Sequence, residues 1–287
     1  EGWFLGAELP PTVLELEDGR TIQPRISRTF RPDVQDKFET DPFQGFSAHF
    51  LLKEAKPSRL MIGNRAIDVP NASEFCTVDP HYGDLLDTAS VQHRADIYGQ
   101  GPTLPSSPEI LALCGSMHGK VLDFGCGNGD LVRWLRRERG LDAVGIELDT
   151  DRIRTDILPE VADAITLYGG GTPLPYEDGL FDAIIATEVI EHVPGFQEFV
   201  PEFLRILKPG GLLYITVPDI SSIPLSSITG TVPWHLLEAT HVNFFTHESL
   251  EASLAPFKIL ERFQLCSVVV SDRTIPGSLG AIYEAPA

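Results

Sequence analysis

The segment from Val121 to Gly129, VLDFGCGNG, constrains the fold of this chain more than any other. Two apolar residues lead into Asp123. Glycines then follow at alternate positions: Gly125, Gly127 and Gly129. A helix-like run, DLVRWLRRERG, begins at Asp130. Glycines let the backbone bend sharply and let a ligand lie against bare main chain. The segment therefore predicts a strand that turns through a glycine loop into a helix, as in doubly wound α/β domains.

The spacing of these glycines separates several classes of ligand. A dinucleotide loop has the pattern G-x-G-x-x-G, but the sixth position is Asp130 when counted from Gly125 and Val132 when counted from Gly127. An acid at the helix start also repels a pyrophosphate. No Gly-Lys-Ser/Thr follows, which excludes a P-loop. The alternative is a tight turn without a ligand, although closely spaced glycines cost backbone entropy that folding alone seldom requires.

The pattern Asp-x-Gly-x-Gly-x-Gly resembles motif I of the class I S-adenosylmethionine-dependent methyltransferases. S-adenosylmethionine (SAM) has no phosphate and carries a sulfonium cation, so nearby acids are favourable. The resemblance extends from about Val91 to Ala287. It implies a Rossmann-like α/β fold with a mostly parallel seven-stranded sheet whose last strand is antiparallel. It also implies that SAM is the cofactor and that the loop binds its methionine portion, through Asp123, Gly125, Cys126, Gly127 and Gly129.

An acid ends the next predicted strand, in the segment LDAVGIELD. This residue, Glu147, lies 22 positions after Gly125. An acid about 20 residues beyond a glycine loop can accept hydrogen bonds from ribose hydroxyls. The resemblance implies that Glu147 binds the ribose and that Leu148 belongs to the same site. The alternative is a solvated acid beside the Asp-Thr-Asp run that follows.

The segment after Leu167 resembles a further family pattern. Its matching residues are Leu174, Pro175, Tyr176, Asp178, Phe181 and Asp182. It departs from the pattern at Gly170, where the family often has an acid that holds the adenine amino group. The backbone from Gly170 to Thr172, including Gly171, is expected to make this contact instead.

The predicted strand from Asp182 to Thr187 continues into EVIEHV, which resembles another stretch of the family. This places Thr187 and Glu188 among the cofactor contacts, at the carboxyl end of the middle strand, where open α/β sheets bind ligands. A helix is expected from about Phe196 to Leu207. The stretch LKPGGLLYITVP resembles the turn and fifth strand of the fold. Two later stretches, FKILERFQLCSVVVS and LGAIYEAP, predict an antiparallel edge pair.

Two histidines are candidates for the catalytic base. Methyl transfer from a sulfonium is an in-line displacement that depends on positioning, and a hydroxyl acceptor benefits from a general base near neutral pH. His192 and His241 are predicted for this task, with His235 behind them. The alternatives are a helix-start residue for His192 and a structural link for His241. Thr246 is predicted to cap a helix that starts at His247.

Aromatic residues near the second histidine form either an acceptor pocket or part of the core: Trp234, Phe244 and Phe245. No acid cluster with ligand spacing is evident, so no metal is predicted. The four cysteines lack CxxC spacing, which argues against zinc and favours a reduced cytoplasmic protein. No run approaches the ~18 apolar residues of a membrane span.

Residues 1–75 carry a different pattern. Short alternating stretches, among them TVLELEDG and SRLMIGNRAIDV, are interrupted by Pro, Gly and Asp. This spacing predicts a small all-β sandwich. The stretch RPDVQDKF…GFSAHFLL resembles a β-sandwich module found beside bacterial glycosyltransferases and polysaccharide-modifying enzymes, which implies a glycan context. The alternative is an accessory domain that packs on the enzyme or joins it to other domains.

A polar connector covers residues 76–108 and separates the sandwich from the methyltransferase domain predicted over 109–287. Its segment from Leu85 to Ile97 is compatible with a helix. In many similar enzymes such a segment folds over the cofactor, which implies a lid in which Arg94, Tyr98 and Gln100 contact the methionine end. The alternative is an ordinary linker.

The charge balance limits the acceptor. Formal net charge is −19, and residues after Phe75 hold 29 of the 41 acidic side chains but 13 of the 22 basic ones. Nucleic acids are recognised through basic patches, so they are not expected as partners. The sequence therefore predicts O-methylation of a small molecule or a glycan, with a bacterial surface polysaccharide preferred.

Two other classes of protein are alternatives to an active methyltransferase. The first is a non-catalytic methyltransferase-fold binding module within a larger glycan-synthesis protein, which the missing acid at Gly170 favours. The chain begins at Glu1 without a methionine, which is compatible with a fragment of a longer protein or complex. The second is a nicotinamide enzyme, which the failed G-x-G-x-x-G frames disfavour.

Overall fold

The computed structural model describes residues 2–5, 9–50, 57–68, 106–222, 241–266, 268–270, 273–275 and 277–287. Most of the predicted connector, with Arg94, Tyr98 and Gln100, lies outside these residues, as do Trp234 and His235. Within the described ranges the strands are β1 (Gly2–Trp3), β2 (Thr12–Leu16), β3 (Thr21–Ile22), β4 (Arg25–Thr29), β5 (Gly45–His49), β6 (Pro57–Ile62), β7 (Arg65–Asp68), β8 (Lys120–Phe124), β9 (Asp142–Leu148), β10 (Ile165–Tyr168), β11 (Phe181–Thr187), β12 (Leu207–Pro218), β13 (Lys258–Leu265), β14 (Val268–Val270), β15 (Arg273–Ile275) and β16 (Ser278–Glu284).

The α-helices of the described residues are α1 (Pro32–Phe38), α3 (Pro108–Leu113), α4 (Asp130–Glu138), α5 (Asp151–Asp156), α6 (Phe199–Ile206) and α8 (His247–Ser253). Short 3₁₀ helices cover η1 (Cys114–Ser116), η2 (Pro159–Ala164), η3 (Ile190–His192), η4 (Phe196–Glu198) and η5 (Ile220–Ser222). The predicted start of α4 at Asp130 is confirmed. So is the cap at Thr246, whose hydroxyl accepts a hydrogen bond from the Ser249 N–H. None of the described helices is long and apolar enough to cross a membrane.

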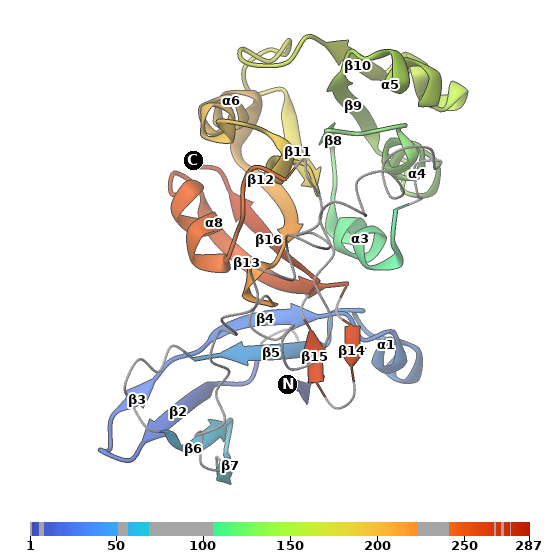
Figure 1. The fold of residues 1–287 in the computed structure, drawn as a ribbon. Helices are drawn as coiled ribbons and strands as arrows, with labels where there is room; N and C mark the ends of the chain where they lie inside the picture. The colour runs from blue at the N-terminus through green and yellow to red at the C-terminus, as the bar shows by residue number, and fades with distance from the viewer. Residues whose placement is uncertain are drawn as a thin grey trace.

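A large mixed sheet forms the centre of the molecule, with strand order β1-β5-β4-β13-β16-β12-β11-β8-β9-β10 (Figure 1). From β10 to β12 the strands run parallel. Strand β16 runs antiparallel to both of its neighbours, β12 and β13. The chain reverses its direction of travel across the sheet between β8 and β11, which creates the switch point where such sheets bind ligands. This is the predicted Rossmann-like arrangement, in a sheet larger than the predicted seven strands.

Two hydrophobic clusters cover the two faces of this sheet. Successive residues of a strand point to opposite faces, so on β8 Leu122 joins the cluster that includes α6 and α8, whereas Val121 joins the cluster that includes α3 and α4. On β11, Ile184 and Ile185 divide in the same way. Helices on both faces explain why these strands are nearly continuous apolar runs.

The N-terminal strands continue the central sheet. Strand β4 pairs in parallel with β13, β5 pairs with β4, and β1 pairs with β5. The predicted antiparallel pairing of β13 with β16 is confirmed, but they do not form an edge pair because β4 covers β13. The ring of Phe43 packs edge-on against Phe263, with centroids 4.9 Å apart. Burying a phenylalanine of this kind contributes about 1.5–3 kcal/mol.

The rest of the described N-terminal region forms a second, four-stranded sheet in the order β3-β2-β6-β7. It lies at the end of the molecule away from β9 and β10 (Figure 1). The stretch RPDVQDKF, predicted within an all-β region, forms α1, with Pro32 in its first turn. Proline fits there because its missing N–H has no helical partner to lose. An independent sandwich domain stays a prediction.

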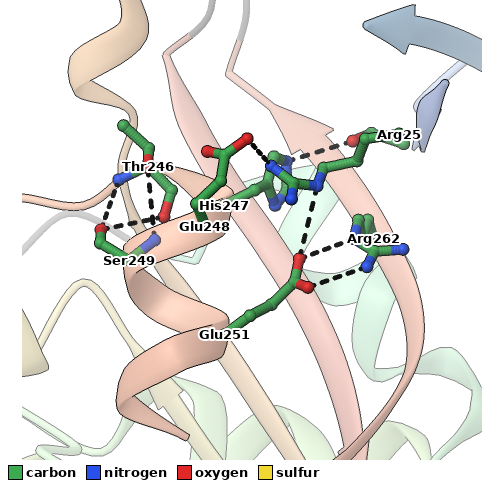
Figure 2. Close-up of polar contacts among 8 residues, drawn as sticks. Arg25, Thr246, His247, Glu248, Ser249, Glu251 and Arg262 are labelled. Atoms are coloured by element: carbon green, nitrogen blue, oxygen red, sulfur yellow. Dashed lines mark hydrogen bonds and ion pairs between the residues drawn. The ribbon is translucent and has the colours of Figure 1, made fainter. Parts of the chain in front are cut away.

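A polar network joins β4 to α8 and β13 (Figure 2). Arg25 forms ion pairs with Glu248 and Glu251, and Glu251 accepts two hydrogen bonds from Arg262, at 2.8 and 3.0 Å. Behind them, the buried Ser27 Oγ lies 3.1 Å from Nε2 of His247. These contacts fix α8, and with it the segment before it, against the N-terminal strands.

Candidate functional site

The loops after β8, β9 and β11 meet at the carboxyl edge of the parallel sheet. Asp123 on β8 is in register with Gly145 on β9 and Ile185 on β11. The three strands therefore end side by side, and the residues that follow them converge. This edge holds the cofactor residues that the sequence predicts after these three strands.

The glycine loop has a backbone that side chains would not tolerate. Gly125, Gly127 and Gly129 have φ values of 75°, 53° and 85°, in the left-handed region. A Cβ at Gly125 would lie 2.5 Å from a methyl carbon of Val189. The Gly125 N–H donates to the Ile146 carbonyl at 2.9 Å, which holds the loop against β9. Gly129 is the N-cap of α4.

Cys126 contributes to this loop through packing. Its side chain is buried, and a Cβ at Gly145 would lie only 2.5 Å from its sulfur. Burial raises the pKa of the Cys126 thiol, and the nearby acids Asp123 and Glu147 raise it further. The thiol therefore stays protonated inside the core. The cofactor contact that the sequence assigns to Cys126 stays a prediction.

Glu147 links the glycine loop to the end of β9. Its carboxylate accepts hydrogen bonds from the N–H groups of Gly127, at 2.9 Å, and of Leu148, at 2.7 Å. A carboxylate has about four acceptor sites, so Glu147 keeps capacity for further donors. The side chain is half-buried, at the border between loop and solvent. These free acceptor sites suit the predicted binding of ribose hydroxyls.

An exposed apolar surface lies next to Glu147. Leu148 is 47% exposed, although it is a large hydrophobic residue. Gly170 approaches it so closely that a Cβ there would lie 3.2 Å from Leu148 Cδ2. Gly170, Gly171 and Thr172 are themselves exposed. The structure thus brings together Leu148 and the glycine backbone that the sequence predicts for the adenine.

Asp123 is buried at the end of β8, 2% exposed. Burial raises its pKa to about 7, and the negative charge of Glu147 acts in the same direction. A cation placed beside Asp123 would favour its ionised form. Asp123 is therefore suited to a positively charged ligand and unsuited to a phosphate.

The end of β11 is strained. Thr187 is half-buried, and Glu188 after it has a φ of 53°, which is uncommon for a residue other than glycine. The Glu188 N–H donates to the Thr216 carbonyl at 2.9 Å. Burial raises the pKa of the Glu188 carboxyl, and the hydroxyls of Thr216 and Ser278 act in the opposite direction. Such strain is typical of functional sites.

The two predicted histidines lie together. Their ring centroids are 4.6 Å apart at an interplanar angle of 69°. His192 sits in η3, directly after β11, with its side chain 32% exposed, and His241 is 7% exposed. Glu191 is buried beside them, with Oε1 3.8 Å from His192 Nε2. The structure thus brings the two predicted histidines together, and their catalytic role stays a prediction.

Asn243 holds the two histidine segments in place, a role that the sequence analysis missed. Its side-chain amide donates to the carbonyls of Ile190 and Val193, both at 2.8 Å. The N–H groups of Val242 and Asn243 donate to the Glu191 carbonyl at 2.8 and 3.0 Å. Glu191 was also missed, although it stands next to His192 in the quoted EVIEHV stretch. Neither residue has a local pattern that reveals its contacts.

The aromatic residues near His241 separate into two groups. Phe245 is buried and packs edge-on against Phe196, with centroids 5.4 Å apart, so it belongs to the core. Phe244 is 48% exposed and Val242 is 50% exposed. Only these two offer apolar surface to a second ligand in the described part of this segment.

The site fits SAM at three points of this structure. Bare glycine surface lines the loop, Glu147 keeps free acceptor capacity, and Leu148 offers an exposed apolar face. Together with the sheet order, these features define a class I methyltransferase domain. Residues 102–256, more than half of the chain, match the sequence profile of the methyltransferase domain family. The chain belongs to this family, and SAM is its methyl-donor cofactor.

Three relatives illustrate the match. A 2-methyl-6-phytyl-1,4-hydroquinone methyltransferase of Synechocystis is 29% identical over 54% of this chain and 50% of its own length. Methyltransferase GfsG of Streptomyces halstedii is 34% identical over 48% of this chain and 50% of its own length. A ubiquinone biosynthesis O-methyltransferase of Pectobacterium atrosepticum is 33% identical over 34% of this chain and 42% of its own length. The chain thus spans at most half the length of these relatives.

Proposed function

We propose that this protein transfers the methyl group of SAM to a hydroxyl oxygen of a small-molecule or glycan acceptor. The observation that carries the proposal is the position of the His192–His241 pair beside the glycine loop. Val189, three residues before His192, lies so close to that loop that a Cβ at Gly125 would be 2.5 Å from its methyl carbon. The segment that carries the proposed base therefore lies beside the donor-binding loop. This proximity suits direct methyl transfer between two bound ligands.

Each part of the site has a separate task in this proposal. When bound, SAM supplies an electrophilic methyl group on a positively charged sulfur. The loop backbone and Glu147 bind and orient the donor, and Asp123 provides negative charge beneath it. One imidazole of the His192–His241 pair accepts the acceptor hydroxyl's proton as the oxygen attacks. The second imidazole and Glu191 stabilise the imidazolium that forms.

Two kinds of acceptor hydroxyl have support. The relative named a ubiquinone biosynthesis O-methyltransferase supports transfer to an oxygen, and the relative named for a hydroquinone supports an aromatic acceptor. The N-terminal resemblance to modules beside polysaccharide-modifying enzymes supports a sugar hydroxyl, with a bacterial surface polysaccharide as the preferred glycan. Val242 and Phe244 present an exposed apolar surface next to His241, which suits an aromatic ring or the apolar face of a sugar. We place the enzyme in the cytoplasm, in keeping with its free thiols at Cys114, Cys126 and Cys266.

The proposal is tested by incubating the full chain with SAM and two acceptor panels, substituted catechols and hydroquinones in one, methyl glycosides and oligosaccharides in the other. Formation of S-adenosylhomocysteine and of a methyl ether is measured. Turnover on either panel supports the proposal and selects the acceptor class. Tight donor binding in calorimetry without turnover on any acceptor would instead favour the non-catalytic binding module.

A further inference from the structure

The carboxylate of Glu191 and the imidazoles of His192 and His241 form a cluster of potential metal ligands. One ligand atom from each residue lies within 4.8 Å of the other two. Ligand atoms that share a first-row metal ion at about 2.0–2.2 Å lie about 3–4 Å apart. The distance between Glu191 Oε1 and His192 Nε2, 3.8 Å, already lies in that range. This grouping differs from the sequence analysis, which found no cluster with ligand spacing.

Glu191 has the properties of a ligand without its ion. Its side chain is 1% exposed, and among the described residues neither carboxylate oxygen has a hydrogen-bond partner. Burying a carboxylate without compensation is costly. A cation bound by the Glu191 carboxylate would provide that compensation.

The backbone around the cluster is held before any ion binds. Four hydrogen bonds join residues 190–193 to residues 242–243: two from the Asn243 amide and two from backbone N–H groups to the Glu191 carbonyl. These bonds fix the segment that follows His241 over η3, which carries the other two groups. Supports of this kind are characteristic of sites that keep ligands near their binding geometry.

We infer that Glu191, His192 and His241 form a binding site for a divalent first-row transition-metal ion. Two imidazole nitrogens and one carboxylate oxygen are a ligand set used by zinc, manganese and iron. Calcium takes oxygen ligands only, and magnesium strongly prefers them. Three protein ligands leave open positions on the ion.

The role of the ion rests on the proposed function, whereas its binding does not. An acceptor hydroxyl bound at an open position would lose its proton to water near neutral pH. The oxygen would keep the electron pair, form the new bond to the methyl carbon of SAM, and the carbon–sulfur pair would stay on sulfur. The ion would then replace the imidazole base as the activator of the acceptor.

The test uses Mn²⁺ as the probe and the full chain, freed of metal with a chelator that is then removed. Electron paramagnetic resonance titration is expected to show one tightly bound Mn²⁺ per chain. In Glu191→Gln and His192→Gln the affinity should fall at least tenfold. The matched control is His118→Asn, an exposed histidine ahead of β8, which should bind as the wild type does. No binding to the wild type, or equal binding to all variants, overturns the inference.

A second measurement does not depend on the folding of the variants. Pulsed electron paramagnetic resonance on the wild-type protein with Mn²⁺ should show coupling to histidine nitrogen. Bound Mn²⁺ without nitrogen coupling places the ion elsewhere and overturns the inference. Methyl transfer that persists unchanged in chelator, with Mn²⁺ still bound in its absence, removes the catalytic role of the ion but leaves the proposed function standing. Bound Mn²⁺ without methyl transfer on any acceptor supports the site and counts against the proposed function.

Discussion

The imidazole rings of His192 and His241 lie 4.6 Å apart, centroid to centroid, and nearly perpendicular, at 69°. Their backbones belong to segments about fifty positions apart, joined by hydrogen bonds to the carbonyls of Ile190, Glu191 and Val193. The pair is therefore a product of two loops, one after β11 and one before α8. Its place beside the glycine loop is the basis of the first two predictions.

Replacing either histidine should slow methyl transfer without weakening the binding of SAM. For His192→Asn and for His241→Asn we expect kcat to fall by about 10²–10⁴, the usual contribution of a general acid–base group. The dissociation constant for SAM should stay within about twofold, because neither ring belongs to the glycine loop. Stopped-time assays of S-adenosylhomocysteine and calorimetry check the two quantities. Wild-type kcat in both variants, with His118→Asn as the reference, would contradict the assignment.

Asn243→Ala should lower activity indirectly, by loosening the segments that carry His192 and His241. The change removes two hydrogen bonds of 2.8 Å and leaves the carbonyls of Ile190 and Val193 without this donor. We expect the free energy of unfolding to fall by about 1–3 kcal/mol. Because the segment after His241 loses its anchor, kcat should also fall, at unchanged donor affinity. Asn243→Asp tests the same point, since it cannot donate, and an active Asp variant would argue against a positioning role.

Glu147→Gln should weaken donor binding. The amide keeps the size of the side chain but loses its charge and turns one oxygen acceptor into a donor that faces backbone N–H groups. Hydrogen bonds to a charged partner contribute about 1.5–3 kcal/mol, so we expect a loss of affinity of about 10–100-fold in calorimetry. Glu177→Gln, an exposed acid away from the loop, is the control. An unchanged affinity in Glu147→Gln would disprove the ribose assignment.

Asp123 predicts a pH dependence of stability. Its pKa is raised from 3.8 to about 7 in the folded protein, so the folded state holds the proton more tightly than the unfolded state. The contribution of Asp123 to the free energy of unfolding is full below about pH 4, decreases as the pH rises to about 7, and then stays constant, with a total change of up to about 4 kcal/mol.

Urea unfolding of wild type and Asp123→Asn at pH 4, 5.5, 7 and 8 isolates this contribution, because other groups cancel in the difference. The variant should be relatively more stable at high pH. A difference that does not change with pH, or changes in the opposite direction, would count against a buried, neutralised Asp123.

Gly125→Ala should disrupt the loop for two separable reasons. The left-handed backbone costs an alanine about 1–2 kcal/mol, and the new Cβ would collide with Val189. Gly140→Ala is the matched control, because Gly140 has a φ of 64° but open space around it, so only the backbone cost remains. We expect the free energy of unfolding to fall more in Gly125→Ala than in Gly140→Ala. The double variant Gly125→Ala/Val189→Ala should recover part of the difference, and equal losses in the two single variants would contradict the collision.

Local patterns in the sequence were sufficient for the elements around the loop. The glycines predicted a turn before a helix at Asp130, and the apolar run before Glu147 predicted β9, because both depend on the conformational preferences of neighbouring residues. The cap at Thr246 follows from the same local chemistry. The donor-binding roles of Asp123 and Glu147 stay predictions, which the geometry supports.

The pairing of strands that are distant in the chain could not be predicted from the sequence. Strand β4 joins β13 through residues more than two hundred positions apart, where backbone hydrogen bonds carry no side-chain signature. The sequence therefore indicated a separate sandwich, whereas the structure extends the central sheet into the N-terminal region. Which helices cover each face was likewise decided by how apolar surfaces fit together.

In the candidate catalytic site, too, some features could be predicted from the sequence and others depended on the tertiary structure. The residue types and the EVIEHV stretch identified His192 and His241 one at a time, because imidazole chemistry can be recognised from a single residue. Only the tertiary structure placed both rings against the buried carboxylate of Glu191, since that contact requires two loops to be brought together by Asn243 and backbone hydrogen bonds. Sequence thus determined the donor loop and the chemical groups, and folding determined which groups meet.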